Sequence, residues 1–249
     1  VHINKFLDQL NELQKQNITI DKVSGSSAGA GVAMNFLAGN FAYIEQLFER
    51  LTTCLRDTHQ IGVIPTLIRD NVYYLFDNDT TALDVLQDRL FISYYNVEER
   101  KQKVVSSYSS REELIEYLIR TSFVPYLING ESRHKNKYID GFYPYIFKPE
   151  PNIKNIYINL QSIYKFVDIV KISHDKNCYR RIIDAINDTH TFYLMNKTTI
   201  LCSYVEDWNT RDQLVYNIRL IISKLLQTCI VLYRGIIINI PDTIYIFVL

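Results

Sequence analysis

Five residues near the start of the chain have the types and order of a nucleophile elbow. Gly25-Ser26-Ser27-Ala28-Gly29 matches the pattern G-x-S-x-G, in which a serine occupies a tight turn between a strand and a helix. The neighbours must be small, and Gly25 and Gly29 leave room for the backbone to reverse. The pattern predicts Ser27 as a nucleophile, and it predicts the backbone amide of Ala28 as a donor to an oxyanion.

A serine hydroxyl is a poor nucleophile at neutral pH, so Ser27 needs a base. In one scheme a histidine takes the proton and a carboxylate orients it; in the other an aspartate accepts the proton directly. The sequence offers Asp140, which is followed by Gly141, for the second scheme. An Asp-Gly pair by itself is also typical of a simple turn. The histidines available for the first scheme have no recognisable motif around them: His59, His134, His174 and His190.

Several of these features occur in a familiar order. The segment from Val23 to Ala30, with its small-residue elbow, is followed by Thr121-Ser122-Phe123-Val124-Pro125 and then by Ile139-Asp140-Gly141. Asp140 lies 113 positions after Ser27 (140 − 27). Over about residues 1–145 the chain resembles the patatin-like phospholipase family, whose D-G-[GA] motif supplies an aspartate that partners the serine without histidine.

The resemblance implies a lipid acyl hydrolase that cleaves carboxylic ester bonds through an acyl-enzyme intermediate. Ser27 would be the nucleophile and Asp140 the general base, with Gly25, Gly29 and Gly141 as motif glycines. It implies no metal and no organic cofactor. The expected substrate is a phospholipid or a neutral-lipid ester, met at a membrane or lipid-droplet surface without spanning the bilayer.

The chain departs from the family pattern at two points. Phe142 occupies the third position of the D-G-[GA] motif, where it could crowd the backbone or form part of an acyl pocket. The family also carries a Gly-rich loop between its first strand and first helix, which provides the main oxyanion hole, and these 249 residues contain no such loop. We expect that strand and loop to lie upstream of Val1. Without them turnover should be slow, since one oxyanion donor is worth about two to three orders of magnitude in rate.

Composition excludes some classes of function. Lys plus Arg and Asp plus Glu both number 27, so no basic excess exists to attract nucleic acid. The four cysteines are isolated, with no Cys/His cluster at metal-ligand spacing, which indicates a reducing compartment. The apolar residues 214–249 are interrupted by charges and a proline, so we expect no membrane anchor. These features favour a cytoplasmic protein, and the resemblance implies that it acts peripherally at membranes.

The spacing of apolar residues predicts an α/β fold. We expect the patatin-like arrangement, a three-layer α/β/α sandwich with a mostly parallel central sheet and helices on both faces. Residues 1–249 are predicted to form a single domain, in which 146–249 are the mostly helical C-terminal part. The predicted strands are residues 18–23, 90–97, 103–108 and 156–160, and the predicted helices are residues 2–16, 28–37, 41–57, 63–76, 79–89, 110–120 and 210–235.

Two other functions remain open on the sequence. One is an α/β-hydrolase with a Ser-His-Asp triad that uses His174 or His190. The other is a module that keeps the patatin-like fold and binds lipid without turnover, as the missing loop suggests. The sequence leaves the oligomeric state, the head group and the position of the cleaved ester undetermined.

Overall fold

The computed structural model describes residues 19–40, 42–58, 62–76, 80–126, 128–158, 178–218, 220–222 and 224–225. The chain divides into two compact units, each of which is assembled from separate stretches of sequence. Unit 1 comprises residues 1–21, 55–57 and 146–214, and unit 2 comprises residues 22–54, 58–145 and 215–249. That the two form a single domain stays a prediction. The predicted helix at residues 2–16 lies outside the described residues.

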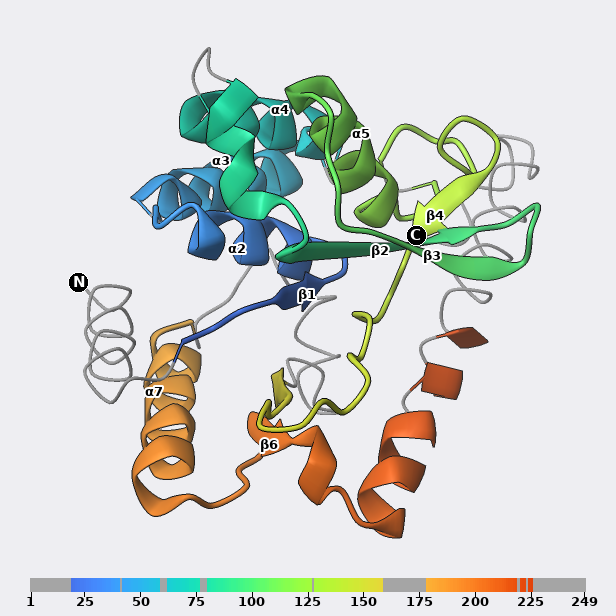
Figure 1. The fold of residues 1–249 in the computed structure, drawn as a ribbon. Helices are drawn as coiled ribbons and strands as arrows, with labels where there is room; N and C mark the ends of the chain where they lie inside the picture. The colour runs from blue at the N-terminus through green and yellow to red at the C-terminus, as the bar shows by residue number, and fades with distance from the viewer. Residues whose placement is uncertain are drawn as a thin grey trace, which may run out of the picture. The chain divides into compact units, whose positions relative to one another are not determined.

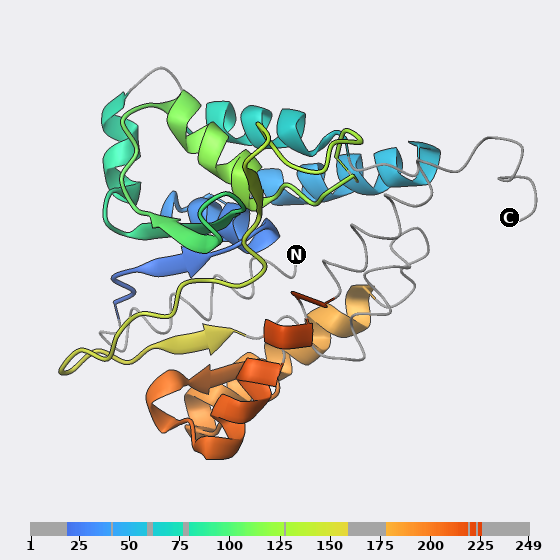
Figure 2. The same cartoon turned by 90° about the vertical axis from the view of Figure 1, so that its right-hand side faces the viewer.

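Unit 2 is a mixed α/β structure around a four-stranded sheet (Figure 1). Its helices and strands in chain order are β1 (Val23–Gly25), α2 (Ala28–Leu37), α3 (Ala42–Thr58), α4 (Ile64–Leu75), the 3-10 helix η1 (Thr80–Leu86), β2 (Leu90–Asn96), β3 (Lys101–Val105), α5 (Arg111–Thr121) and β4 (Tyr138–Asp140). Helices α2 and α5 pack against the same face of the sheet, and α4 packs on α5 (Figures 1 and 2).

The central strand of this sheet is β2, because β1, β3 and β4 all pair with it. Strand β1 is parallel to β2, whereas β3 and β4 are antiparallel to it. The prediction of a mostly parallel sheet is therefore wrong for the described strands. The reason is local: only residues 97–100 separate β2 from β3, and so short a connection can join only antiparallel strands.

The core of unit 2 lies between the sheet and its helices. Helix α2 buries Ala30, Ala33, Met34 and Leu37, which recur at helical spacing, against Leu90 and Ile92 of β2 and against α5. Helix α5 begins as its sequence predicts. The Ser110 side chain accepts a hydrogen bond from the Glu113 amide at 3.1 Å, and the Glu113 carboxylate accepts one from the Ser109 amide. A rigid sheet with two covering helices thus supports the loops at its edge.

Unit 1 is smaller in its described part. A two-stranded sheet of β5 (Ile156–Ile158) and β6 (Cys202–Tyr204) packs with α7 (Cys178–Met195) around Phe192, Leu201 and Cys202, and the 3-10 helix η3 (Val205–Asp207) follows. Strand β5 was predicted and β6 was not. The next helix begins at Thr210, and its cap is Asn209, whose side chain accepts from the amides of Arg211 and Asp212. The sequence pattern from Thr210 to Gln213 is that of a capping box and favours Thr210 as the cap, but Thr210 already lies within the helix.

Most predicted elements of unit 2 are confirmed, with shifted ends. The strand expected at residues 18–23 begins only at Val23. The α-helix expected from Asp79 to about Arg89 is instead the 3-10 helix η1, which ends at Leu86. Among the described residues no helix has the length and apolarity needed to cross a bilayer.

Candidate active site

The two residues expected to do chemistry meet because β1 and β4 share one edge of β2. Gly25, the last residue of β1, pairs with Ile92, and Asp140, the last residue of β4, pairs with Tyr94. Since β1 is parallel to β2 and β4 is antiparallel, their carboxyl ends point at each other along that edge. Only Ser93 lies between them on β2. The two ends are thus roughly 7 Å apart, at about 3.3 Å per strand residue.

Ser27 occupies the strand-to-helix turn that its motif predicts. Strand β1 ends at Gly25, α2 begins at Ala28, and Ser27 is the residue before that helix. Its backbone has φ 54° and ψ −134°, a conformation that a residue with a side chain adopts only under strain. Such strain is characteristic of the nucleophile elbow, because it lifts the serine side chain out of the turn.

The two motif glycines of the elbow have different roles. A Cβ atom on Gly25 would lie 2.5 Å from Cα of Ala30, so only glycine lets the helix pack this closely on the strand. A Cβ atom on Gly29 would meet nothing within 4 Å, and its φ is not positive. The expectation that Gly29 makes room for the backbone is therefore wrong, because the chain turns before Gly29 and that residue already lies in the first turn of α2.

The elbow leaves one backbone donor available. The amides of Gly29 and Ala30 donate to the carbonyls of Ser26 and Ser27, at 3.0 Å each. The amide of Ala28 donates to no acceptor within the described part of the chain, and Ala28 is exposed. At the start of a helix this amide suits the oxyanion role expected of it. Ser27 itself is half-buried.

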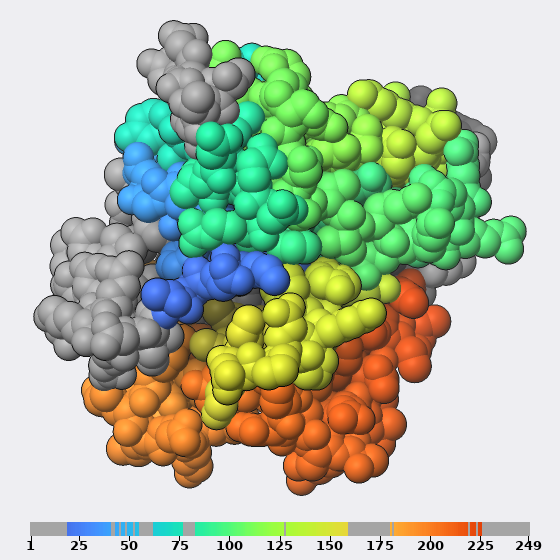
Figure 3. Space-filling view, viewed as in Figure 1, coloured from blue at the N-terminus to red at the C-terminus, as the bar shows by residue number. Residues whose placement is uncertain are grey.

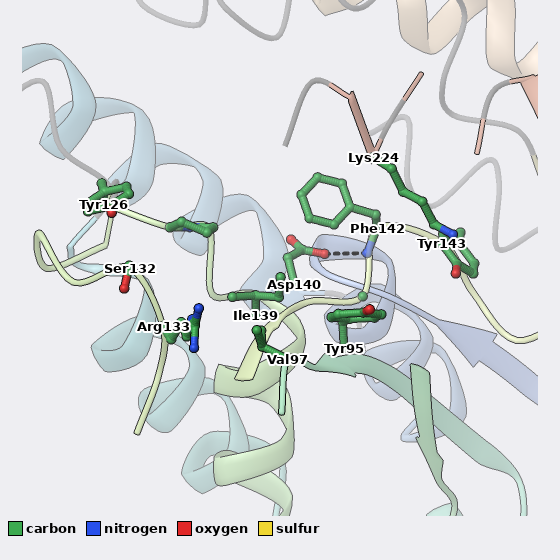
Figure 4. A pocket seen from close by; sticks show the side chains of 12 residues that line it. Tyr95, Val97, Tyr126, Ser132, Arg133, Ile139, Asp140, Phe142, Tyr143 and Lys224 are labelled. Atoms are coloured by element: carbon green, nitrogen blue, oxygen red, sulfur yellow. Dashed lines mark hydrogen bonds between the residues drawn. The ribbon is translucent and has the colours of Figure 1, made fainter. Parts of the chain in front are cut away.

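Asp140 is the buried partner of Ser27. It is only 4% exposed, and burial raises the pKa of its carboxyl from the ordinary 3.8 to about 6. The Ser27 hydroxyl, the Phe142 amide and the Ser26 hydroxyl stabilise the ionised carboxyl and oppose that rise in pKa. The Phe142 amide donates to Oδ1 at 2.7 Å (Figure 4). A carboxylate with this pKa is ionised at neutral pH and is a stronger base than an exposed one.

The turn after Asp140 explains the Asp-Gly pair. A Cβ atom on Gly141 would lie against the carbonyl oxygen of Ser93 and 2.7 Å from Oγ of Ser26, so glycine is required by space. Phe142 has φ 61°, in the left-handed region, where glycine is favoured. A glycine in the third position of a D-G-[GA] motif would adopt this conformation without strain. Phe142 adopts this left-handed conformation with some backbone strain, and its ring lies beside the Asp140 carboxylate (Figure 4).

A cavity of about 470 Å³ opens next to Asp140 (Figure 4). Asp140, Gly141 and Phe142 line it, and Ser27 does not. Its wall is mainly apolar and aromatic, with cationic side chains on two sides of the carboxylate, Arg133 on one and Lys224 on the other (Figure 4). Beyond Tyr143 the chain returns to β1, where the Tyr145 amide donates to Oγ of Ser24 at 2.8 Å. The space-filling view shows residues that follow β4, in yellow, beside the blue residues of β1 (Figure 3).

The sequence analysis assigned no role to three further polar residues of the site. Thr121, at the end of α5, is fully buried, and its Oγ1 accepts a hydrogen bond from the Ser27 amide at 2.8 Å. The same hydroxyl donates to the carbonyl of Ser93 at 2.6 Å. Ser26 reaches the Asp140 carboxyl. The sequence signal for Thr121 is weak: apolar residues nearby in the chain indicate that its hydroxyl would be buried and would need a hydrogen-bond partner.

The histidines considered for a triad do not reach Ser27 where the structure describes them. Nε2 of His134 lies 3.2 Å from Oε1 of Glu116, and its ring lies against Phe123. His190 is exposed on α7. His59 and His174 lie outside the described residues. In the described parts of the chain, Asp140 is thus the titratable group whose pKa the Ser27 side chain influences.

No group of side chains that could hold a metal ion occurs in the described ranges. Comparisons with protein-family models, with curated proteins and with solved structures find no match to this chain. The patatin-like resemblance, with the three-layer architecture that it implies, therefore stays a prediction, and the functional argument rests on the geometry of Ser27 and Asp140.

Proposed function

We propose that this chain is a serine acyl hydrolase that cleaves carboxylic esters through a Ser27–Asp140 dyad. The observation that carries the proposal is the pairing of an elbow serine with a buried carboxyl across Ser93, with no imidazole of the described residues between them. A strained nucleophile, a base of raised pKa and a helix-start amide are the three parts that ester hydrolysis requires.

The reaction would proceed in two steps. Asp140 accepts the hydroxyl proton of Ser27 as Oγ forms a bond to the ester carbonyl carbon, and the carbonyl oxygen becomes an oxyanion near the Ala28 amide. Collapse of this intermediate breaks the bond to the alkoxy oxygen, which leaves as an alcohol with the proton from Asp140. Water then attacks the acyl-enzyme carbonyl and gives a proton to Asp140. Collapse of this second intermediate breaks the bond to Oγ of Ser27, which takes that proton back from Asp140 as the carboxylic acid leaves.

The cavity beside Asp140 supports a lipid ester as the substrate. Its apolar and aromatic wall suits an acyl chain, and Arg133 and Lys224 suit the phosphate of a phospholipid head group. The patatin-like resemblance implies that this hydrolase would act at a membrane or lipid-droplet surface. Neutral-lipid esters remain alternative substrates for the same dyad.

One observation favours a second candidate, a lipid-binding module without turnover. Within the described residues of the elbow, Ala28 supplies a single backbone donor for the oxyanion. An enzyme that lacks one donor loses about two to three orders of magnitude in rate. A slow hydrolase and a lipid-binding module are therefore distinguished by one test, which is whether Ser27 reacts with an ester or a serine-reactive probe.

Hydrolysis of a short-chain p-nitrophenyl ester tests the dyad. We expect Ser27→Ala to abolish activity and Asp140→Asn to lower kcat/KM about 1,000-fold, a magnitude typical of the loss of a general base. His134→Ala and His190→Ala are the matched controls and should keep most of the activity, as should His59→Ala and His174→Ala. Activity that survives Asp140→Asn and is lost with a histidine would establish a triad instead.

A further inference from the structure

Thr121 connects the elbow to the central strand. It is the last residue of α5, and its side chain is completely buried. A threonine hydroxyl has one proton to donate and can accept two hydrogen bonds. Here it accepts from the Ser27 amide at 2.8 Å and donates to the Ser93 carbonyl at 2.6 Å, which fixes its orientation. Oγ of Ser26 lies 3.5 Å away.

Ser93 is the other end of this connection, and its position is unusual. The residues on either side of it pair with Gly25 of β1 and with Asp140 of β4, so the ladder on that edge is interrupted at Ser93. A buried carbonyl at such a gap needs a donor from elsewhere, and Thr121 supplies it. The Ser93 hydroxyl in turn donates to the carbonyl of Tyr143, just beyond the Asp140 turn, at 2.8 Å.

These contacts link the two halves of the site through one residue. On the side of Ser27, the Ser27 amide bonds the Thr121 hydroxyl, which bonds the Ser93 carbonyl. On the side of Asp140, the Ser93 hydroxyl bonds the Tyr143 carbonyl. Gln102 of β3 donates to the same Tyr143 carbonyl at 2.9 Å. Displacing Thr121 would therefore free the elbow without removing any group that contacts a substrate.

We propose that Thr121 is a positioning residue that holds the backbone of Ser27 in its left-handed conformation, and so keeps Oγ of Ser27 in reach of Asp140. The inference rests on the proposed function and deepens it. Ser27 has φ 54°, and its amide would be without a partner if the Thr121 hydroxyl were absent. The elbow would then relax toward an unstrained conformation.

The test compares Thr121→Val, which keeps the shape and removes the hydroxyl, with Thr121→Ser, which keeps the hydroxyl. We expect Thr121→Val to slow the labelling of Ser27 by a fluorophosphonate probe about 100-fold, as for a nucleophile misplaced by about 1 Å. Ester hydrolysis should show the loss in kcat with KM unchanged. Hydrogen exchange at the Ser27 amide should become faster in Thr121→Val, and Thr121→Ser should restore both rates.

Thr189 provides the matched control. It is also buried in a helix, and its hydroxyl donates to the Ala185 carbonyl within that helix, at 2.7 Å. Thr189→Val should leave labelling of Ser27 unchanged. If Thr121→Val does not fold, Thr121→Ala serves in its place, because it leaves space rather than an apolar group beside the amide.

The outcomes separate this inference from the function on which it rests. A folded Thr121→Val or Thr121→Ala variant labelled as fast as the unaltered chain overturns the positioning role, and so does a Thr121→Ser variant as slow as Thr121→Val. An unaltered chain that is never labelled at Ser27 contradicts the proposed hydrolase itself, before any Thr121 variant is considered.

Discussion

The site is made of two turns that face each other across Ser93 and that prepare their functional residues in different ways. In the elbow the strain falls on the functional residue, since Ser27 itself has φ 54°. In the second turn Asp140 keeps its place in β4, and the left-handed conformation falls on Phe142, two residues later. The elbow exposes its residue in part, whereas the second turn buries Asp140 almost completely.

The difference follows from the chemistry that each residue would perform. A nucleophile must reach a carbonyl carbon, so backbone conformation is the effective means of presenting it. A base must have a suitable pKa, and removal from water is the effective means of raising the pKa of a carboxyl. The two turns thus prepare Ser27 by geometry and Asp140 by burial.

The largest effect should come from closing the space between the two turns. Gly141→Ala would push a methyl group into the Ser93 carbonyl and Oγ of Ser26. We expect it to lower the free energy of unfolding by at least about 3 kcal/mol. Gly29→Ala is the matched control, since its Cβ meets nothing and it lies in a helix; it should raise that free energy by about 0.5–1 kcal/mol. Urea unfolding measures both, and equal effects would contradict the packing described for the two turns.

The next effect concerns the burial of Asp140. Its carboxyl has a pKa near 6 in the folded protein and near 3.8 when exposed. Below pH 3.8 the group is neutral in both states, so it has no effect on stability there; above pH 6 the folded state holds a charge that water would hold better. The free energy of unfolding is therefore highest at low pH and falls as the pH rises from 3.8 to about 6, by about 3 kcal/mol for about two pKa units.

Asp140→Asn should remove that loss of stability while lowering kcat/KM about 1,000-fold. We compare the free energy of unfolding of the variant with that of the unaltered chain. This difference should be more favourable to the variant at pH 8 than at pH 4, by up to about 3 kcal/mol. Urea unfolding of both proteins at the two pH values measures this change. The opposite result would be a stability difference that becomes less favourable to the variant from pH 4 to pH 8. It would mean that hydrogen bonds stabilise the buried carboxylate by more than its loss of hydration destabilises it.

The sequence singled out the two candidate residues, Ser27 and Asp140, because each belongs to a local pattern. The strand-turn-helix around Ser27 and the capping box at Ser110 depend on neighbouring residues, and both are confirmed. The pairing of β4 with β2 could not be read in the same way, because it joins residues far apart in the chain. Three-residue strands such as β4 also carry too few side chains for a periodic pattern.

The role of Thr121 was hidden for the same reason. Its partners are 94 and 28 positions away, and both are backbone groups, so nothing in their residue types marks them. The prediction of a mostly parallel sheet was wrong because only residues 97–100 join β2 to β3, and so short a connection makes the two strands antiparallel.

The pH dependence of Ser27 labelling tests the central claim most directly. A fluorophosphonate probe is reacted with the unaltered chain from pH 4.5 to 8.5, and the labelled peptide is identified by mass spectrometry. The account predicts label on Ser27, at a rate that is constant above about pH 7 and falls to half near the Asp140 pKa of about 6. Label on another residue, or a rate on Ser27 that does not change between pH 8.5 and pH 4.5, would contradict it.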